Sequence, residues 1–94
     1  MKVNQKDNGL DGAFYVEVEG RNVAELSYSH EKPNKLILQH TVVSEDFKGK
    51  GIGYELIEAS VNYMRSNNLK VIPKCSYADA IFKKKHAEYA DVLN

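Results

Sequence analysis

The sequence predicts a mixed α/β (α+β) fold in which antiparallel strands come first, followed by a strand–helix–strand crossover and a short C-terminal helix. Apolar residues alternate with period two in much of the first half, and from Ile52 the period changes to 3.6 residues. A chain of 94 residues buries only about 60 to 65% of its unfolded surface, which limits the core to one sheet with one or two helices. We therefore expect a single domain over residues 1–94.

A β-hairpin is expected first, after a polar lead over residues 1–12. Apolar and polar side chains alternate over residues 14–19, which is typical of a half-buried strand. Residues 20–22 are of types that favour a turn. Apolar and polar side chains alternate again over residues 24–28, which predicts the return strand.

The third expected strand covers residues 35–43 and follows a turn at residues 30–34. It is dense in apolar and β-branched side chains, which favours a central strand covered on both faces. Three antiparallel strands therefore precede the change of period.

The second half predicts a crossover. Residues 52–66 form an amphipathic helix with a narrow polar strip, and residues 69–75 form a short strand. Because such crossovers are right-handed and return the chain in the same direction, the last strand should run parallel to the 35–43 strand. A final short helix is expected over residues 79–86, before an apolar tail.

Charge and cysteine content exclude several classes of protein. The chain carries 13 basic and 13 acidic residues, which argues against a nucleic-acid coat. Residues 1–47 hold five basic and eight acidic side chains, whereas residues 48–94 hold eight basic and five acidic ones, so an anion should bind to the second half. One cysteine forms no internal disulfide, and no targeting leader or apolar run of membrane length stands out. We expect a cytoplasmic monomer without a membrane or nucleic-acid partner.

Three glycines alternate with other residues between the third strand and the long helix. In the segment Lys48-Gly49-Lys50-Gly51-Ile52-Gly53, the backbone can curl so that successive N–H groups converge on a phosphate at the positive end of the helix dipole. The segment matches neither of two common phosphate-binding motifs. The dinucleotide-binding fingerprint needs a small residue where Leu56 stands, and the P-loop needs Lys-Ser or Lys-Thr after its last glycine. The alternative is a flexible loop that caps the helix.

This segment resembles the acetyl-coenzyme A loop of the GCN5-related N-acetyltransferases, with Lys48 where that family usually has Arg or Gln. The resemblance covers residues 35–93 well. It implies acetyl-coenzyme A as cosubstrate, and Lys48, Gly49, Lys50, Gly51, Ile52 and Gly53 as its phosphate-binding loop. It also implies that Val42 and Val43 offer main-chain groups to the pantetheine arm, and that the next strand splays away, a position that suits Pro73.

Two departures from the family pattern bear on catalysis. The chain has no long helical segments after its first strand, and Phe82 stands where the family often has a tyrosine that protonates the leaving thiolate. The segments Cys75-Ser76-Tyr77-Ala78 and His86-Ala87-Glu88-Tyr89 resemble a short acetyltransferase-like subfamily. We expect Tyr77 and Phe82 beside the coenzyme, although core packing is an equal alternative for Tyr77.

Cys75 and His40 are the candidate catalytic residues. A thiol and an imidazole at matching ends of adjacent parallel strands can lie within hydrogen-bond reach, which activates a sulfur nucleophile and allows an acyl-cysteine. The alternatives are a small buried apolar cysteine and a core histidine that faces inward with Leu36 and Leu38 unless a β-bulge turns it. No metal site is expected, because no Cys, His and carboxylate set has ligand spacing. The run Lys83-Lys84-Lys85 is a solvated face, or one of its lysines binds the adenosine 3′-phosphate.

These observations predict an acetyl-coenzyme A–dependent acyltransferase with an unknown amine or thiol acceptor. A non-catalytic coenzyme sensor or carrier is the alternative, favoured by Phe82 and by the missing helical segments. A third hypothesis is an adaptor that binds a macromolecular partner and no coenzyme.

Overall fold

The computed structural model describes residues 1–93 and has one five-stranded sheet with three α-helices. The elements in chain order are β1 (Asn4–Asp7), β2 (Asp11–Val18), β3 (Arg21–Glu31), β4 (Lys35–Val43), the short 3-10 helix η1 (Glu45–Phe47), α1 (Ile52–Ser66), β5 (Lys70–Pro73), α2 (Ser76–Lys84) and α3 (Ala90–Leu93). The mixed α/β class is confirmed, as are the bounds expected for β4 and α1.

The sheet order is β1-β2-β3-β4-β5, and only β4 and β5 are parallel. The parallel pair is the predicted product of the crossover through α1. Strand β1 corrects one expectation, since residues 4–7 lie in the expected polar lead and pair antiparallel with β2. Its pattern of mostly exposed polar side chains carries no apolar alternation from which a strand could be predicted.

Several boundaries also differ from the expected ones, and β5 covers Lys70–Pro73 rather than residues 69–75. The hairpin turn is Glu19-Gly20, both with positive φ (51° and 78°), so Arg21 already begins β3. The geometry matches the tight turns whose twist suits a two-residue hairpin loop. Helix α2 begins at Ser76 rather than at residue 79, because the N–H of Asp79 already bonds to the carbonyl of Cys75 (2.8 Å).

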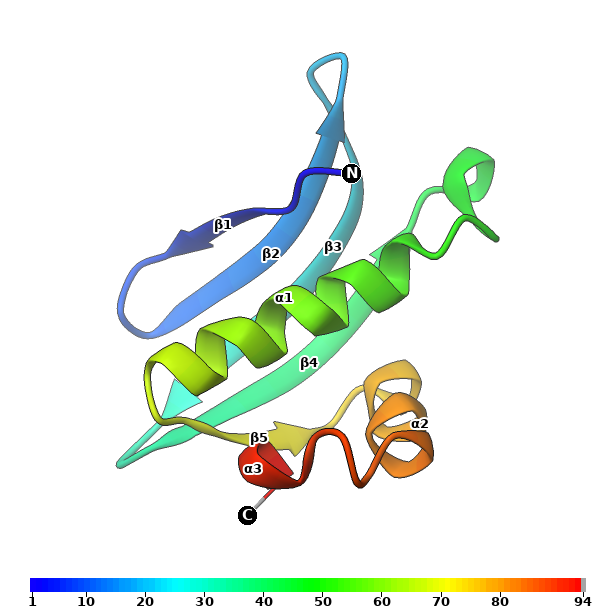
Figure 1. Cartoon of the computed structure of the whole chain (residues 1–94). Coiled ribbons are helices and arrows are strands. Elements are labelled where there is room, and N and C mark those ends of the chain that lie inside the picture. Colours follow the sequence, from blue (N-terminus) through cyan, green and yellow to red (C-terminus); the bar gives the residue numbers. More distant parts are fainter. Residues whose placement is uncertain (94) are drawn as a thin grey trace.

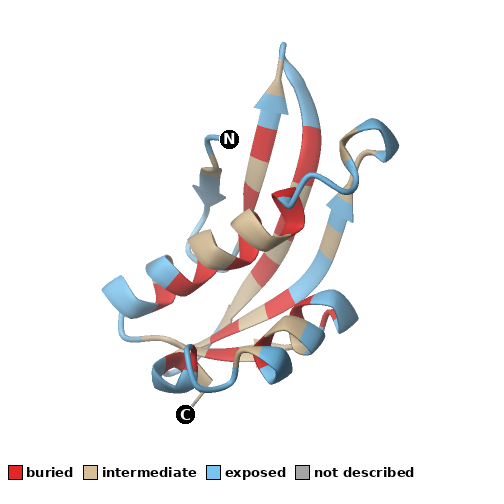
Figure 2. Cartoon of the chain, turned by 45° about the vertical axis from the view of Figure 1, so that its right-hand side comes forward, coloured by how far each residue is buried: buried red, intermediate tan, exposed pale blue. Residues whose placement is uncertain are grey.

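All three α-helices cover the same face of the sheet (Figure 1). The core lies between that face and the helices, where the side chains of Leu26, Leu38, Leu56 and Met64 are fully buried. Strand β4 is therefore covered on one face only, which corrects the expected burial on both. Figure 2 shows the result along the strands, as buried residues alternate with half-buried or exposed ones.

Candidate functional site

The loop between β4 and α1 has two glycines in the left-handed region. Gly49 and Gly51 have φ of 79° and 78°, and nothing lies within 4 Å of a Cβ added to either. Glycine is therefore required at both positions by the backbone conformation and not by a lack of space for a side chain. Gly51 directly precedes α1, and its carbonyl accepts the N–H of Glu55 (3.1 Å). The first N–H groups of α1 have no carbonyl in the preceding turn to bond to, so they are free to bind an anion.

Gly53 serves a different purpose from the other two glycines. A Cβ at this position would lie 2.7 Å from the hydroxyl and 2.9 Å from Cζ of Tyr77. Gly53 therefore lets the Tyr77 ring lie against the first turn of α1. The sequence pattern grouped all three glycines in one phosphate cradle, and this packing role was missed because it depends on a residue 24 positions away.

Strands β4 and β5 separate at Pro73, as expected for a residue that cannot donate to a ladder. Their last paired residues are Leu38 and Pro73. The N–H groups of Lys74 and Cys75 then both bond to the Leu38 carbonyl (2.9 and 3.0 Å), and α2 begins at the next residue. Within residues 1–93, β4 continues to Val43 with no strand on that side. Its backbone from residue 39 onward is therefore an open edge.

A β-bulge in β4 decides which side chains face this opening. The β3–β4 register passes from Ser27 opposite His40 to Tyr28 opposite Leu38, so Gln39 is the extra residue. After the bulge, Thr41 faces the helix side, and His40 and Val42 face the uncovered side, where both are exposed. The expected pairing of His40 with Cys75 is therefore not formed, and Thr41 takes that place.

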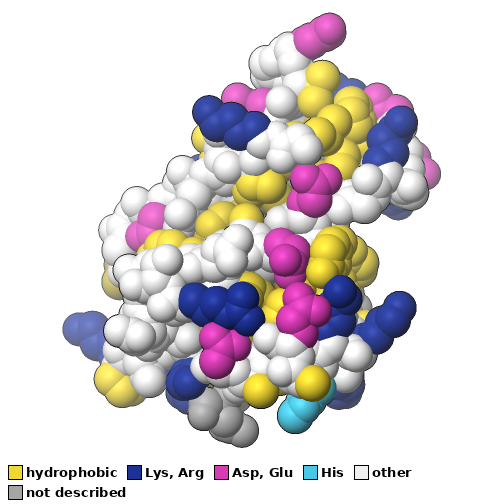
Figure 3. Space-filling view, in the orientation of Figure 1, with side chains coloured by type: hydrophobic (Ala, Val, Ile, Leu, Met, Phe, Trp, Pro, Cys, Tyr) yellow, Lys and Arg dark blue, Asp and Glu magenta, His cyan; other side chains and the backbone are white. Residues whose placement is uncertain are grey.

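A cavity of 390 Å³ lies between the loop, the open edge of β4 and α2. Figure 3 shows the corresponding notch on the right of the molecule. The cavity is lined by Thr41, Val43, Phe47, Lys48, Gly49, Gly51, Ile52, Gly53 and Tyr77. Seven of these were expected at the coenzyme; Thr41 and Phe47 were not, because the bulge and the η1 turn that bring them there leave no periodic signal.

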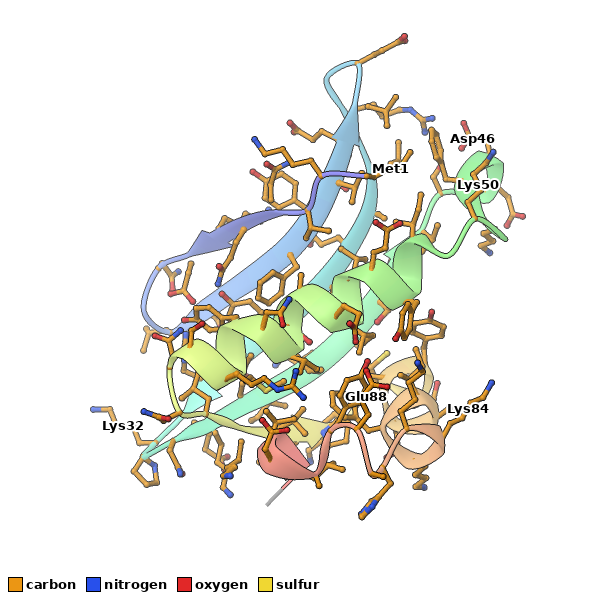
Figure 4. The ribbon with its side chains drawn as sticks, in the orientation of Figure 1. Met1, Lys32, Asp46, Lys50, Lys84 and Glu88 are labelled. Carbon is orange, nitrogen blue, oxygen red and sulfur yellow. The ribbon has the colours of Figure 1, made fainter. Side chains whose placement is uncertain are left out.

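Three residues expected at the coenzyme do not line this cavity. Val42 faces the uncovered side of the sheet and is 64% exposed. Lys50 projects from the loop near Asp46 (Figure 4). Phe82 is only 1% exposed and packs on the Tyr89 ring, with centroids 5.2 Å apart. Phe82 therefore belongs to the core between α2 and the C-terminal segment.

Cys75 lies beside the opening, at the start of α2. Its Sγ is 3.2 Å from Oγ1 of Thr41. Burial raises the pKa of the Cys75 thiol, but hydrogen bonds from the Thr41 hydroxyl and from the N–H groups of Ala78, Tyr77 and Thr41 outweigh it, and the pKa falls below its ordinary value. The structure therefore places Thr41, and not His40, next to this thiol.

Most of the lysines near the cavity already have partners. Lys48 Nζ lies 2.9 Å from Glu45 in an exposed ion pair. In the 83–85 run, Lys83 pairs with Asp79 (2.9 Å) and Lys85 donates to the Tyr54 hydroxyl (2.8 Å), whereas Lys84 points away from the molecule (Figure 4). No group of three potential metal ligands occurs among residues 1–93, and no helix in that range has the length and apolar character needed to cross a membrane.

Comparison with known proteins agrees with the resemblance noted in the sequence. A family model described as GCN5-related N-acetyl-transferase matches residues 13–92. A solution structure of a GCN5-like putative N-acetyltransferase from Staphylococcus aureus is similar at 34% identity, with a TM-score of 0.71, over 95% of this chain and 85% of that one. No curated protein matches the sequence.

More distant structures share the fold. A ribosomal-protein-alanine N-acetyltransferase from Brucella melitensis biovar Abortus 2308 has 16% identity and a TM-score of 0.69, over 83% of this chain and 62% of that one. The enzyme AAC(6')-Iy, in complex with a bisubstrate analog built on coenzyme A, has 15% identity and a TM-score of 0.60, over 87% of this chain and 62% of that one. This chain therefore spans less than two thirds of these larger proteins.

Proposed function

Because the chain belongs to the GCN5-related N-acetyltransferase family, we propose that it binds acetyl-coenzyme A and transfers the acetyl group to an amine or thiol acceptor. The observation that carries the proposal is the cavity where the glycine loop meets the open edge of β4. Such an edge offers main-chain groups to an extended ligand, and the loop offers N–H groups to a phosphate.

In this proposal the pyrophosphate binds the N–H groups of residues 49–53. Gly49 and Gly51 hold the loop in the required conformation, and the N-terminal end of α1 adds its positive dipole. The pantetheine arm runs along β4 from Val43 toward Thr41, with Phe47 and Tyr77 as apolar walls. Binding energy from these remote contacts positions the thioester near Cys75.

Two routes of transfer fit this arrangement. In direct transfer, the acceptor nitrogen or sulfur attacks the thioester carbonyl, the bond to the coenzyme sulfur breaks, and the thiolate released is protonated. In the two-step route, the Cys75 thiolate makes that attack and forms an acyl-cysteine, which the acceptor then cleaves. The lowered pKa of Cys75 and its contact with Thr41 favour the second route.

A coenzyme sensor or carrier is the second candidate, and the position of Phe82 favours it. Phe82 is buried and supplies no proton to a leaving thiolate. A sensor would bind acetyl-coenzyme A and would not release coenzyme A when amines or thiols are added.

The test is a titration with acetyl-coenzyme A followed by amide chemical shifts. We expect the largest shifts at residues 49–53 and at the open edge of β4, with small shifts on β1 and β2 as the internal reference. A chain that shows no saturable shifts would contradict coenzyme binding and favour an adaptor. Steady-state release of coenzyme A with a panel of amines and thiols then separates an acyltransferase from a sensor.

A further inference from the structure

The connection between β4 and α1, residues 44–51, has few interactions of its own. No residue of η1 is buried, and the side chain of its N-cap residue, Ser44, bonds to none of the η1 backbone N–H groups. Gly49 and Gly51 have open surroundings, since nothing lies within 4 Å of a Cβ added to either. Yet Phe47 of this connection is a wall of the cavity. An interaction from outside the connection is therefore needed to hold it in place.

Arg21, the first residue of β3, supplies that interaction. Its Nη1 donates to the Ser44 hydroxyl (3.0 Å), and its Nη2 donates to the Asp46 carboxylate (2.7 Å). The guanidinium carbon lies 5.8 Å from the centre of the Phe47 ring, a cation–π contact. In the part of the chain that the structure describes, no other side chain from outside this connection forms a hydrogen bond or an ion pair with it.

A β-bulge in β3 decides which face Arg21 lies on. In a regular strand, Arg21 and the buried Ala24 would point to opposite faces of the sheet, because they are three residues apart. In the pairing of β2 with β3, Val23 is an extra residue without a partner. The bulge brings Arg21 to the helix side, where it reaches η1. Figures 1 and 2 both show the end of the β2–β3 hairpin and η1 at the same end of the molecule.

The two polar partners of Arg21 are also bonded to each other. The Ser44 hydroxyl donates to Oδ1 of Asp46 (2.6 Å), and Arg21 bonds to Oδ2. The hydrogen bond from Ser44, and then the one from Arg21, lowers the pKa of Asp46, so its carboxylate is charged at neutral pH. Because the guanidinium is planar and its donors have fixed directions, these contacts set the orientation of η1 as well as its distance from β3.

From these contacts we infer that Arg21 is a positioning residue of the coenzyme site. It holds η1 so that Phe47 forms the wall of the cavity and the glycine loop begins at the right place, and it thereby raises the affinity for acetyl-coenzyme A. Arg21 itself does not line the cavity. The inference rests on the proposed function and adds to it a residue of the β2–β3 hairpin, which lies outside the glycine loop.

Direct attraction between the Arg21 charge and the anionic coenzyme is the alternative, and the two explanations differ in sign at Asp46. If only charge matters, Asp46→Ala should strengthen binding, because it removes a negative charge near the phosphate-binding loop. If Arg21 acts through η1, Asp46→Ala removes its anchor and should weaken binding. The direction of this one change therefore separates the two explanations.

The experiment measures the Kd of acetyl-coenzyme A by titration calorimetry. We expect Arg21→Ala to raise Kd about fivefold and Asp46→Ala about threefold. The double variant should bind no more weakly than Arg21→Ala, since both changes remove the same contact. Arg21→Lys should recover only part of the affinity, because lysine keeps the charge but cannot donate from two fixed positions.

Arg65→Ala is the matched control. Arg65 also makes exposed hydrogen bonds to an aspartate, Asp91 (2.8 and 3.2 Å), and it lies in the last turn of α1, about 20 Å from the loop. This variant should lose similar stability in urea unfolding and leave Kd unchanged. Equal losses of affinity in Arg21→Ala and Arg65→Ala, or tighter binding by Asp46→Ala, would overturn the inference.

A measurement without coenzyme keeps this test apart from that of the proposed function. In the free protein, Arg21→Ala should shift the amide signals of residues 44–48, whereas Arg65→Ala should leave them in place. If the natural chain does not bind acetyl-coenzyme A, the proposed function is contradicted and the inference falls with it. If the natural chain binds and Arg21→Ala binds equally well, only the inference is overturned.

Discussion

The three glycines of the loop act by different physical means. Gly49 and Gly51 adopt a backbone conformation that side chains disfavour, whereas Gly53 has ordinary φ and is required because the Tyr77 ring touches it. Substitution at Gly51 thus changes the shape of the loop, and substitution at Gly53 displaces a wall of the cavity.

We predict that Gly51→Val weakens acetyl-coenzyme A binding more than tenfold, which is about 1.4 kcal/mol or more. Valine disfavours φ of 78°, so the N–H groups of the loop no longer converge. Gly20→Val is the matched control, because Gly20 has the same φ and equally open surroundings in a hairpin turn. Both variants should lose similar stability in urea unfolding. An equal loss of affinity in both would remove the loop from the coenzyme site.

At Cys75 we predict alkylation that acetyl-coenzyme A prevents and a hydroxylamine-sensitive adduct after incubation with the coenzyme. Thr41→Val should slow alkylation at pH 7, because loss of the hydroxyl hydrogen bond raises the pKa of the Cys75 thiol and lowers its thiolate fraction. Mass spectrometry measures the alkylation and the adduct, and Cys75→Ser is the control that should show neither. Protection without an adduct would leave direct transfer as the route, and equal alkylation rates with and without coenzyme would exclude Cys75 from the site.

At the scale of elements, the β-bulge decides on which face of the sheet His40 lies, and it turns His40 to the uncovered face rather than toward Cys75. Regular alternation places His40 with Leu36 and Leu38, whereas the extra residue at Gln39 turns it outward and Thr41 inward. A bulge depends on how two strands pair, so it leaves no trace in the periodicity of one strand. The crossover, by contrast, follows from local patterns in β4 and α1, and both were predicted with their bounds.

The burial of Phe82 in helix α2 can be tested by mutation. Since Phe82 is buried against Tyr89, Phe82→Tyr should destabilise the chain by about 1 to 3 kcal/mol, the cost of burying a hydroxyl without a partner. Coenzyme A release should not increase. Phe82→Met, an apolar change of similar volume, should cost less in the same urea unfolding experiment. A stable Phe82→Tyr variant with faster release would instead place this side chain at the leaving thiolate.

At the scale of the whole molecule, the fold and the position of the glycine loop between β4 and α1 could be predicted because short segments carry them. The polar network at Asp7 could not, because it joins three elements. The Asp7 carboxylate accepts hydrogen bonds from Tyr28 (2.6 Å) and Tyr63 (3.4 Å) and lies 2.8 Å from His30 Nε2. These contacts hold β1 against β3 and α1. The sequence of β1 contains only polar residues, so it gives no sign of this packing.

This network predicts a pH dependence of stability. The hydrogen bond from Tyr28 is the largest contribution that lowers the pKa of Asp7, from 3.8 to about 2, with further contributions from His30 and Gly9 that together outweigh burial. Because the folded pKa lies below the unfolded one, the stabilisation is fully present above about pH 4 and is lost as pH falls through 2. It corresponds to about 2 kcal/mol. In urea unfolding, Asp7→Asn should therefore be less stable than the natural chain at pH 6, and the gap should narrow by about that amount at pH 2. Asp11→Asn on the neighbouring strand is the control, and a gap for Asp7→Asn that does not change with pH would mean that the carboxylate charge does not hold β1 in place.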